Sequence, residues 1–219
     1  MTRGILIIGN ESPLFSAVAE ETASRVEAFA ATIIPGHFQP KEGGPAKINE
    51  KAIILPWNPS SPISTRTLVF AAENRMKQIH DAIIICSPPT IYKNAEDLLP
   101  EEIEILVNEH IKGWFLLVRE LVLYFQRTKK GSLSLVESIK HQGKGHPADL
   151  LGQSAAASFR AFAQGLLSSS LNEACQVMGF SASEADSAEK VAAWVFAKID
   201  KCAKRDSGRW HKFSRFNFL

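Results

Sequence analysis

Short runs of apolar, often β-branched residues alternate with longer amphipathic stretches along the whole chain. Six runs have the length and composition of buried strands, and in chain order they are Gly4–Ile8, Phe29–Ile34, Lys51–Leu55, Asp81–Cys86, Ser132–Val136 and Cys175–Met178. The stretches between them carry helical spacing, at about Ser16–Glu27, Thr65–Ile79, Pro100–Arg127, Ser154–Ser168 and Ser187–Lys204. This alternation predicts an α/β fold, a parallel sheet covered by helices on both faces.

The segments between these elements are short and show no repeat or linker. Two polar stretches, His37–Asn49 and Lys140–His146, contain glycine and read as loops. A chain of 219 residues is large enough for one substantial core. We therefore expect a single domain over residues 1–219, with a core over 1–200 and a basic, aromatic C-terminal segment over 201–219.

Charge and cysteine content narrow the classes of function. The net charge is +2, so no whole-chain attraction to nucleic acid or membrane is predicted. The first apolar run ends at Gly9 and is too short for a signal peptide core or a membrane span. Cys86, Cys175 and Cys202 form no CxxC pair, and the six histidines lack ligand spacing. We expect a cytoplasmic protein with neither disulfide nor metal site.

In the order and spacing of its segments, the chain resembles a short-chain dehydrogenase/reductase from end to end. The resemblance is carried by Ile5–Glu21, His80–Ile85, Val107–Leu117, Gly131–Ser138 and Ala156–Leu166. In that family these places hold the glycine-rich turn, an Asp-led fourth strand, a long helix, the strand with the catalytic serine, and the helix after the catalytic tyrosine. The resemblance implies a Rossmann-like, doubly wound parallel sheet that binds NAD or NADP.

The turn that should hold the dinucleotide pyrophosphate keeps only one glycine. Gly9 remains, whereas Pro13 and Phe15 stand at the other two glycine places and Glu11 adds negative charge. Such a turn needs glycines because the phosphate must approach the backbone at the helix start, and proline also lacks an N–H. A turn that no longer binds the usual cofactor is the favoured interpretation, with Gly9 and Ser12 as remaining contacts for NAD(P) or a smaller anion.

Two further places that contact the cofactor in this family are also altered. The second strand ends at Ile34 followed by Pro35, without the acidic residue that binds the ribose. After the fourth strand, Ser87 is the candidate ligand contact at the strand's carboxyl end. The neighbouring Cys86 reads as a small core residue, because no basic residue nearby would activate its thiol.

The proton-transfer pair of the family is missing. By register the tyrosine falls at Gly152 and the lysine at Ala156, and no tyrosine follows Tyr124. A tyrosine needs a nearby cation to act near neutral pH. Ser138 matches the catalytic serine and His110 takes the place of the asparagine. A Ser138–His110 dyad is the candidate for new chemistry, although a histidine on a helix face is more often structural.

Two polar segments remain open to interpretation. His141 and His146 flank Gly143-Lys144-Gly145 near the expected mouth of the cleft. A solvated loop is the favoured interpretation, and a mobile lid and an anion contact are the alternatives. In the C-terminal segment, basic residues alternate with Trp210, Phe213 and other aromatics. Such a segment either packs on the domain or a neighbouring subunit, which we favour, or binds nucleic acid or an acidic membrane.

These observations favour a catalytically inactive or strongly diverged relative that acts by binding or assembly. A homo-oligomer, a dimer or a tetramer, is expected from apolar residues on more than one face of Pro100–Arg127. The alternatives are an NAD(P)-dependent oxidoreductase with an atypical site, acting on a carbonyl or alcohol, and a sensor of a small anion or metabolite. Neither nucleic acid nor membrane is an expected partner, and no cofactor is expected unless the NAD(P) site survives.

Overall fold

The chain folds around one seven-stranded sheet with the order β3-β2-β1-β4-β5-β6-β7, and every strand pair is parallel. The computed structural model describes residues 3–34, 49–140, 147–169, 175–201 and 207–214. The strand order reverses between β1 and β4, as in a doubly wound fold. The predicted fold class, a Rossmann-like α/β domain with a parallel sheet, is confirmed.

The elements follow each other as predicted, with two additions. The strands are β1 (Ile5–Asn10), β2 (Phe29–Ile34), β3 (Ala52–Ile54), β4 (Asp81–Cys86), β5 (Ser132–Ile139), β6 (Gln176–Ser183) and β7 (Arg209–Lys212). The helices are α1 (Pro13–Ala23), α2 (Pro62–Met76), α3 (Pro100–Val107), α4 (Gly113–Thr128), α5 (Leu150–Ser169) and α6 (Ala188–Asp200), with a 3₁₀ turn η1 (Ala95–Asp97) and a π-helical turn η2 (Asn108–Lys112). Besides the short turn η1, which the sequence also did not predict, the two additions are β7 and the π turn.

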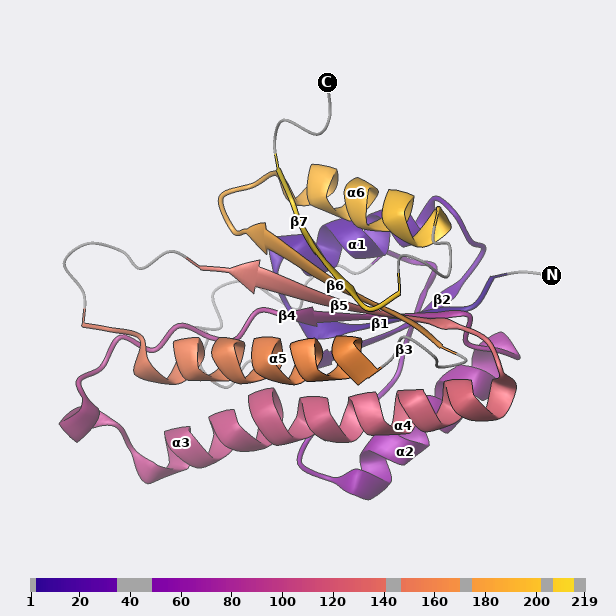
Figure 1. The fold of residues 1–219 in the computed structure, drawn as a ribbon. Coiled ribbons are helices and arrows are strands. Elements are labelled where there is room, and N and C mark those ends of the chain that lie inside the picture. Colours follow the sequence, from indigo (N-terminus) through magenta and orange to yellow (C-terminus); the bar gives the residue numbers. More distant parts are fainter. Residues whose placement is uncertain (1–2, 35–48, 141–146, 170–174, 202–206, 215–219) are drawn as a thin grey trace.

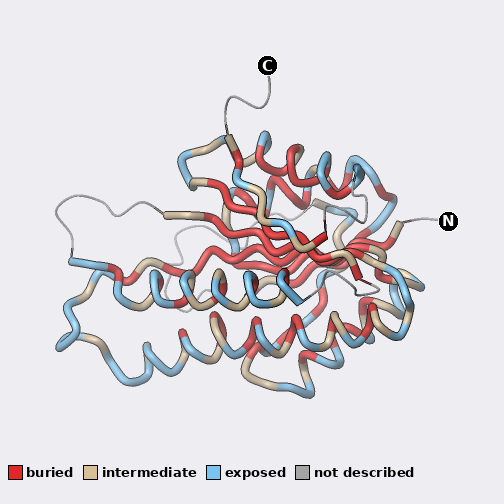
Figure 2. The backbone as a smooth tube through the Cα atoms, in the orientation of Figure 1, coloured by how far each residue is buried: buried red, intermediate tan, exposed pale blue. Residues whose placement is uncertain are grey.

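Helices cover both faces of the sheet. Helices α1 and α6 lie on one face, and α2, α4 and α5 lie on the other (Figure 1). The strands are the most deeply buried part of the chain (Figure 2), and all six residues of both β1 and β4 are buried. Strands enclosed on both faces need apolar side chains at every position, which explains the continuous runs in the sequence.

Alternation along the central strands divides the core into two halves. Leu6 and Ile8 pack with Ile84 in the half beneath α2, α4 and α5. Ile5 and Ile7 pack in the half beneath α1 and α6. Successive strand side chains point to opposite faces, so this assignment fixes the direction of the side chains that follow on each strand.

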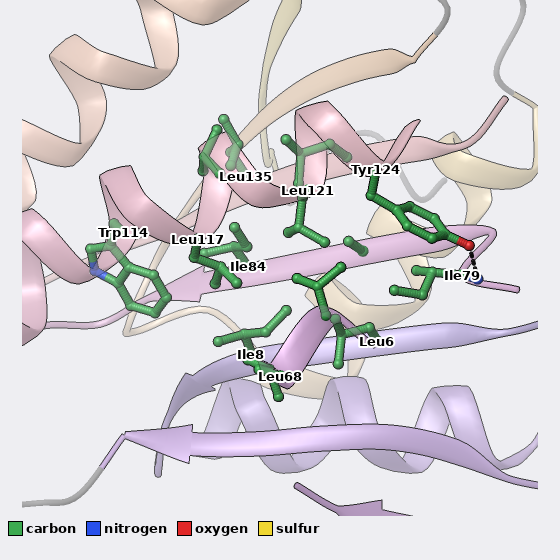
Figure 3. Packing of buried hydrophobic residues seen from close by; sticks show 14 of the residues in the cluster. Leu6, Ile8, Leu68, Ile79, Ile84, Trp114, Leu117, Leu121, Tyr124 and Leu135 are labelled. Atoms are coloured by element: carbon green, nitrogen blue, oxygen red, sulfur yellow. Dashed lines mark hydrogen bonds between the residues drawn. The ribbon is translucent and has the colours of Figure 1, made fainter. Parts of the chain in front are cut away.

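The larger half of the core is built around α4. Trp114 and Leu117 are fully buried against the sheet residues (Figure 3). The Tyr124 hydroxyl accepts a hydrogen bond of 2.9 Å from the Ile79 N–H, just before β4 (Figure 3). Burial raises the pKa of Tyr124, so this tyrosine is a structural group and remains neutral.

The π turn interrupts what the sequence predicted as one helix, Pro100–Arg127. The rod formed by α3 and α4 continues in one direction (Figure 1), but residues Asn108–Lys112 have π geometry. One extra residue in a helix rotates the following positions by about 100°. At the end of the turn, a Cβ on Gly113 would lie 2.6 Å from Pro59 Cβ, so only glycine permits this close approach.

Where a helix or strand begins or ends at a different residue from the predicted one, the cause is local. Helix α5 begins at Leu150 rather than Ser154, because the Asp149 carboxylate caps it by accepting from the Gly152 N–H at 2.9 Å. Strands β5 and β6 extend beyond their predicted ends, to Ile139 and Ser183. Their residues at these ends, polar ones included, still pair with each other in the parallel ladder inside the sheet. The loop His37–Asn49 lies outside the described residues except for Asn49.

The C-terminal segment contributes β7 at the edge of the sheet. The Trp210 indole N–H donates to Ser181 Oγ at 3.1 Å, and its ring covers Gly179, where a Cβ would lie 2.3 Å from the ring. Phe213 is buried and meets Trp194 edge to face at 5.4 Å. Packing on the domain, the favoured interpretation of these aromatics, is confirmed for Trp210 and Phe213.

Two further features are absent from the described ranges. No helix there has the length and apolar character needed to cross a membrane. No group of three or more His, Cys, Asp or Glu side chains in the same residues could hold a metal ion.

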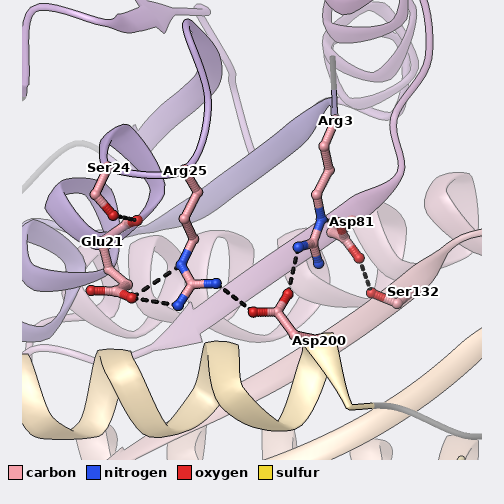
Figure 4. Close-up of polar contacts among 7 residues, drawn as sticks. All are labelled: Arg3, Glu21, Ser24, Arg25, Asp81, Ser132 and Asp200. Carbon is pink, nitrogen blue, oxygen red and sulfur yellow. Dashed lines mark hydrogen bonds and ion pairs between the residues drawn. The ribbon is translucent and has the colours of Figure 1, made fainter. Parts of the chain in front are cut away.

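An ion-pair network joins the N-terminus, β4, α1 and α6 (Figure 4). Arg3 contacts Asp81 and Asp200, each at 2.5 Å, and Arg25 pairs with Asp200 and Glu21. Burial alone would raise the pKa of Asp200, but Arg3 and Arg25 outweigh it and lower the pKa below 3.8. A lowered pKa means that the ionised form stabilises the fold, and that this stabilisation is lost as the pH falls through the lowered value.

We predict that Asp200→Asn lowers the free energy of unfolding at pH 7 by about 1 kcal/mol or less, because the network is partly exposed. The difference from wild type should close as the pH drops below 3.8, the ordinary pKa of the group. Denaturant unfolding at several pH values measures this. Glu104→Gln, at an exposed position of α3, is the control and should show no such pH-dependent gap. A difference in unfolding free energy between Asp200→Asn and the wild type that persists at low pH would contradict a stabilising role of the ionised Asp200.

Candidate functional site

A cavity of about 320 Å³ lies beside α5 at the carboxyl end of β5. We call it the α5 cavity; its lining comes from the β4–η1 segment, the end of β5 and one side of α5. The lining residues are Pro88, Glu137, Ser138, Ile139, Lys140, Asp149, Gly152, Gln153, Ala156, Ala157, Arg160, Ala161 and Gln164. Ligands of open parallel sheets bind at this carboxyl edge.

The α5 cavity exists because one side of α5 has small residues. Gly152, Ala156 and Arg160 are spaced by four and therefore follow one another along a helix face, and all three line the cavity. Gly152 and Ala156 stand at the places of the family's tyrosine and lysine. Thus neither a phenol nor an amine enters the cavity there, and the cation on this row is Arg160, one turn further along.

A charged pair crosses the cavity between β5 and α5. Arg160 donates from Nε at 2.8 Å and from Nη2 at 2.6 Å to the same oxygen of Glu137, Oε2. The Glu137 side chain is 5% exposed and that of Arg160 is 42% exposed, so the carboxylate lies within the protein and the guanidinium reaches solvent. Burial raises the pKa of Glu137, and the hydrogen bonds and charge of Arg160 only partly offset this.

A second carboxylate of the cavity has a structural role. Asp149 Oδ1 accepts from the backbone N–H of Ile91 at 3.1 Å and of Gly152 at 2.9 Å. It thereby joins the start of α5 to the segment after β4. The rim of the cavity is therefore fixed from two sides.

Three other polar side chains line the cavity. Lys140 Nζ lies 3.3 Å from Thr90 Oγ1. The amides of Gln153 and Gln164 form no hydrogen bond within the described part of the chain, and both residues are exposed. These groups are available to a ligand.

A second cavity, of about 220 Å³, lies at the N-terminus of α1. We call it the α1 cavity. Three acidic residues line it, Glu184, Asp186 and Glu189, and no basic residue is among its lining residues. The start of α1 is where a Rossmann fold holds the pyrophosphate, so this lining places negative charge where the cofactor's phosphates would lie.

The residues of the turn before α1 have structural roles. Ser12 Oγ accepts from the Phe15 N–H at 3.1 Å as the N-cap, and Pro13 is the first helical residue. Phe15 is 1% exposed, and a Cβ on Gly9 would lie 3.0 Å from its ring. The backbone oxygen of Ile85 would lie equally close to such a Cβ, so a glycine at position 9 suits this packing. Among the described residues, the buried Asn10 Oδ1 has no hydrogen-bond partner, so the turn also presents an acceptor.

Strand alternation separates Ser138 from the residue beside it. Leu135 belongs to the core half beneath α5 and Val136 to the half beneath α1 and α6. The alternation directs the Glu137 side chain to α5, as its contact with Arg160 shows, and the Ser138 side chain to the other face. Ser138 lines both the α5 cavity and the α1 cavity.

The candidate residues His110 and Ser87 are not among the lining residues of the α5 cavity or the α1 cavity. His110 is 2% exposed within the π turn. Ser87 is buried at the end of β4. Burial raises the pKa of the neighbouring Cys86 thiol, and the charge of Glu137 adds to this effect, so Cys86 is not a nucleophile. His141, Lys144 and His146 lie outside the described residues.

The sequence interpretation did not identify the Glu137–Arg160 pair or Asp149 as part of the site. Two signals could have found the pair. Glu137 is the one charged residue in β5, and Arg160 is the one charged residue in α5. Lone opposite charges on two consecutive buried elements are expected to meet, because an unpaired buried charge is costly.

Sequence comparisons give no relative. No protein-family model matches the chain, and no curated protein matches it either. Its fold, in contrast, is similar to that of many solved structures.

Several of these structures hold a nicotinamide cofactor. One is the 3-ketoacyl-(acyl-carrier-protein) reductase from Brucella melitensis complexed with NADH, with a TM-score of 0.76, 15% identity and 96% of each chain covered. Another is the NADH-dependent reductase A1-R' complexed with NAD, with a TM-score of 0.76 and 13% identity over 97% of this chain and 95% of that chain.

A third similar structure is a variant of a Serratia marcescens short-chain dehydrogenase/reductase. It has a TM-score of 0.73 and 11% identity, and the match covers 96% of this chain and 95% of that chain. At such identities the likeness is one of fold. The chain has, over nearly its whole length, the fold of the short-chain dehydrogenases/reductases.

Proposed function

We propose that the chain is a strongly diverged protein of the short-chain dehydrogenase/reductase fold that acts by binding and assembly, without hydride transfer. The observation that carries this proposal is the packing at Gly152, the place of the catalytic tyrosine. A Cβ there would lie 2.3 Å from Asp149 Oδ2 and 2.3 Å from the backbone oxygen of Pro89. The position is therefore closed to any side chain, which argues against a tyrosine acting from this place.

The cofactor edge supports the same proposal. The α1 cavity is acidic, Ser12 is engaged as an N-cap, and Pro13 lacks the N–H that phosphate would need. An open α5 cavity beside this edge is a place for a ligand that is bound and not reduced. The buried thiols Cys86 and Cys175 suit the reducing cytoplasm that we expect for it.

The rival function is an NAD(P)-dependent oxidoreductase, and it is favoured by the NADH and NAD in the similar structures. In that case Ser138, which lines both cavities, would lie between cofactor and substrate. A buried His110 outside both linings gives no support to a proton relay from Ser138.

For assembly, we propose a homodimer through the exposed face of α3 and α4. Leu99, Ile103 and Val107 follow at intervals of four and are 40–53% exposed. Further along, Leu123 is 46% exposed and Phe115 38%. Exposed apolar side chains along one helical rod are typical of a subunit contact, and a second copy meets them through a two-fold axis.

Calorimetric titration with NAD, NADH, NADP and NADPH tests the loss of the cofactor site. We expect no binding heat and no thermal shift at millimolar cofactor, because negative lining residues meet the phosphates. A cofactor-binding reductase of the same fold is the positive control. Micromolar affinity for any of the four would overturn the proposal and place the oxidoreductase first.

A pair of glycine substitutions in α5 tests whether position 152 is closed to a side chain. Gly152→Ala should lower stability by about 1–3 kcal/mol, because the added methyl group meets a backbone oxygen. Gly165→Ala is the matched control, since nothing lies within 4 Å of its Cβ, and it should stabilise by roughly 0.5–1 kcal/mol. Thermal unfolding compares the two. Equal effects would show that position 152 has room for a side chain.

The oligomer is tested by size-exclusion chromatography with light scattering. The wild type should elute at twice the chain mass of 24.1 kDa, and Leu123→Glu should shift it towards the monomer because a charge would be buried in the contact. Ile63→Glu, at a 79% exposed position of α2, is the control and should remain dimeric. A wild-type protein at the monomer mass would rule out this assembly.

A further inference from the structure

We propose that the α5 cavity binds a small organic acid, whose carboxylate contacts Arg160 and Lys140 and whose apolar body lies against the alanines of α5. The inference rests on the proposed function, because it assigns a ligand class to the cavity that we take to be a binding site. It is carried by three observations: the spare hydrogen-bond donors, the engaged carboxylates and the apolar walls.

The cavity contains more hydrogen-bond donors than the protein's own acceptors occupy. A guanidinium has five N–H groups, and those of Arg160 that contact Glu137 are on Nε and Nη2. Arg160 makes no other hydrogen bond within the described ranges, and its side chain is 42% exposed. Lys140 has three N–H groups, with Thr90 as its hydrogen-bond partner. Several charged donors therefore remain for a ligand.

Each carboxylate of the cavity is, in contrast, engaged through one of its oxygens, Oε2 of Glu137 and Oδ1 of Asp149. Glu137 accepts two hydrogen bonds from Arg160, and Asp149 accepts two from backbone N–H groups. A cationic ligand would be repelled by Arg160 and Lys140, whose side chains line the cavity. A carboxylate supplies the missing acceptors, and its two oxygens match the planar donor fork of a guanidinium.

The remaining walls are apolar and set the size of the ligand body. Pro88, Ile139, Ala156, Ala157 and Ala161 line the cavity. A volume of about 320 Å³ corresponds to roughly ten water molecules at about 30 Å³ each. This is enough for a carboxylate and a body of several carbon atoms, and too small for a dinucleotide. The alanine side chains leave the space that larger residues would fill.

Three probes with one apolar body and different head groups test the inference: hexanoate, hexanamide and hexylammonium. Binding to the full chain is measured by calorimetry and by thermal shift. We expect hexanoate to bind, hexanamide to bind at least tenfold more weakly, and hexylammonium not to bind. Equal affinities for hexanoate and hexanamide would overturn the carboxylate assignment, as would tight binding of hexylammonium.

Variants of Glu137 and Arg160 test whether hexanoate binds in the α5 cavity. Arg160→Gln should weaken hexanoate binding at least tenfold, and Glu137→Gln should strengthen it, because it releases the guanidinium and removes a negative charge. The double variant Glu137→Gln with Arg160→Gln removes both charges and guards against misfolding from an unpaired buried carboxylate. Arg127→Ala, in the α2–α4 groove, is the matched control and should leave the affinity unchanged.

The outcomes separate this inference from the proposed function. Unchanged hexanoate affinity in Arg160→Gln, or no binding of hexanoate to the wild type, would overturn the inference and leave the loss of the cofactor site intact. Binding of NAD or NADP to the wild type would overturn the proposed function, whatever hexanoate does. Loss of affinity in Arg160→Gln together with a gain in Glu137→Gln supports the organic acid.

Discussion

The parallel hydrogen-bond ladder between β1 and β4 is the constraint on which the rest of the structure depends. It pairs Ile5 with Asp81 and Gly9 with Ile85, and both strands are buried throughout. Because the sheet grows outward in opposite directions from this pair, helices must cross on opposite faces. The two core halves, the position of α1 and the carboxyl edge with its cavities all follow from it.

The ion-pair network at the amino edge of the sheet holds the same two strands, β1 and β4, at their starts. Arg3 joins the start of β4 to the end of α6, and Ser132 donates to Asp81 at the start of β5 (Figure 4). Polar pairs close the amino edge, whereas the carboxyl edge keeps unengaged donors. The charged pairs at the amino edge stabilise the fold, and at the carboxyl edge Arg160, although paired with Glu137, keeps donors that we propose for ligand binding.

The sequence was sufficient for the fold and for part of the site. The bounds of β2 and β4 were predicted correctly because their apolar runs are sharply bounded. Ala156 was correctly placed on the helix after β5, whereas Gly152 lay outside the predicted helix and is part of α5. Other features depend on contacts between distant segments. The π turn follows from the approach of Gly113 to Pro59, and β7 from the packing of Trp210 on Gly179. The Glu137–Arg160 pair needs the direction of each side chain, which a one-residue uncertainty in register reverses.

The purely parallel sheet also determines how the chain reaches its fold. No strand pairs with a neighbour through a tight turn, and the central ladder joins residues 76 positions apart, as in Ile5 with Asp81. High contact order of this kind slows folding, because loop-closure entropy precedes any reward from pairing. The nascent chain therefore leaves the ribosome with one edge of β1 unpaired until β4 has emerged, and this apolar edge can aggregate during that interval.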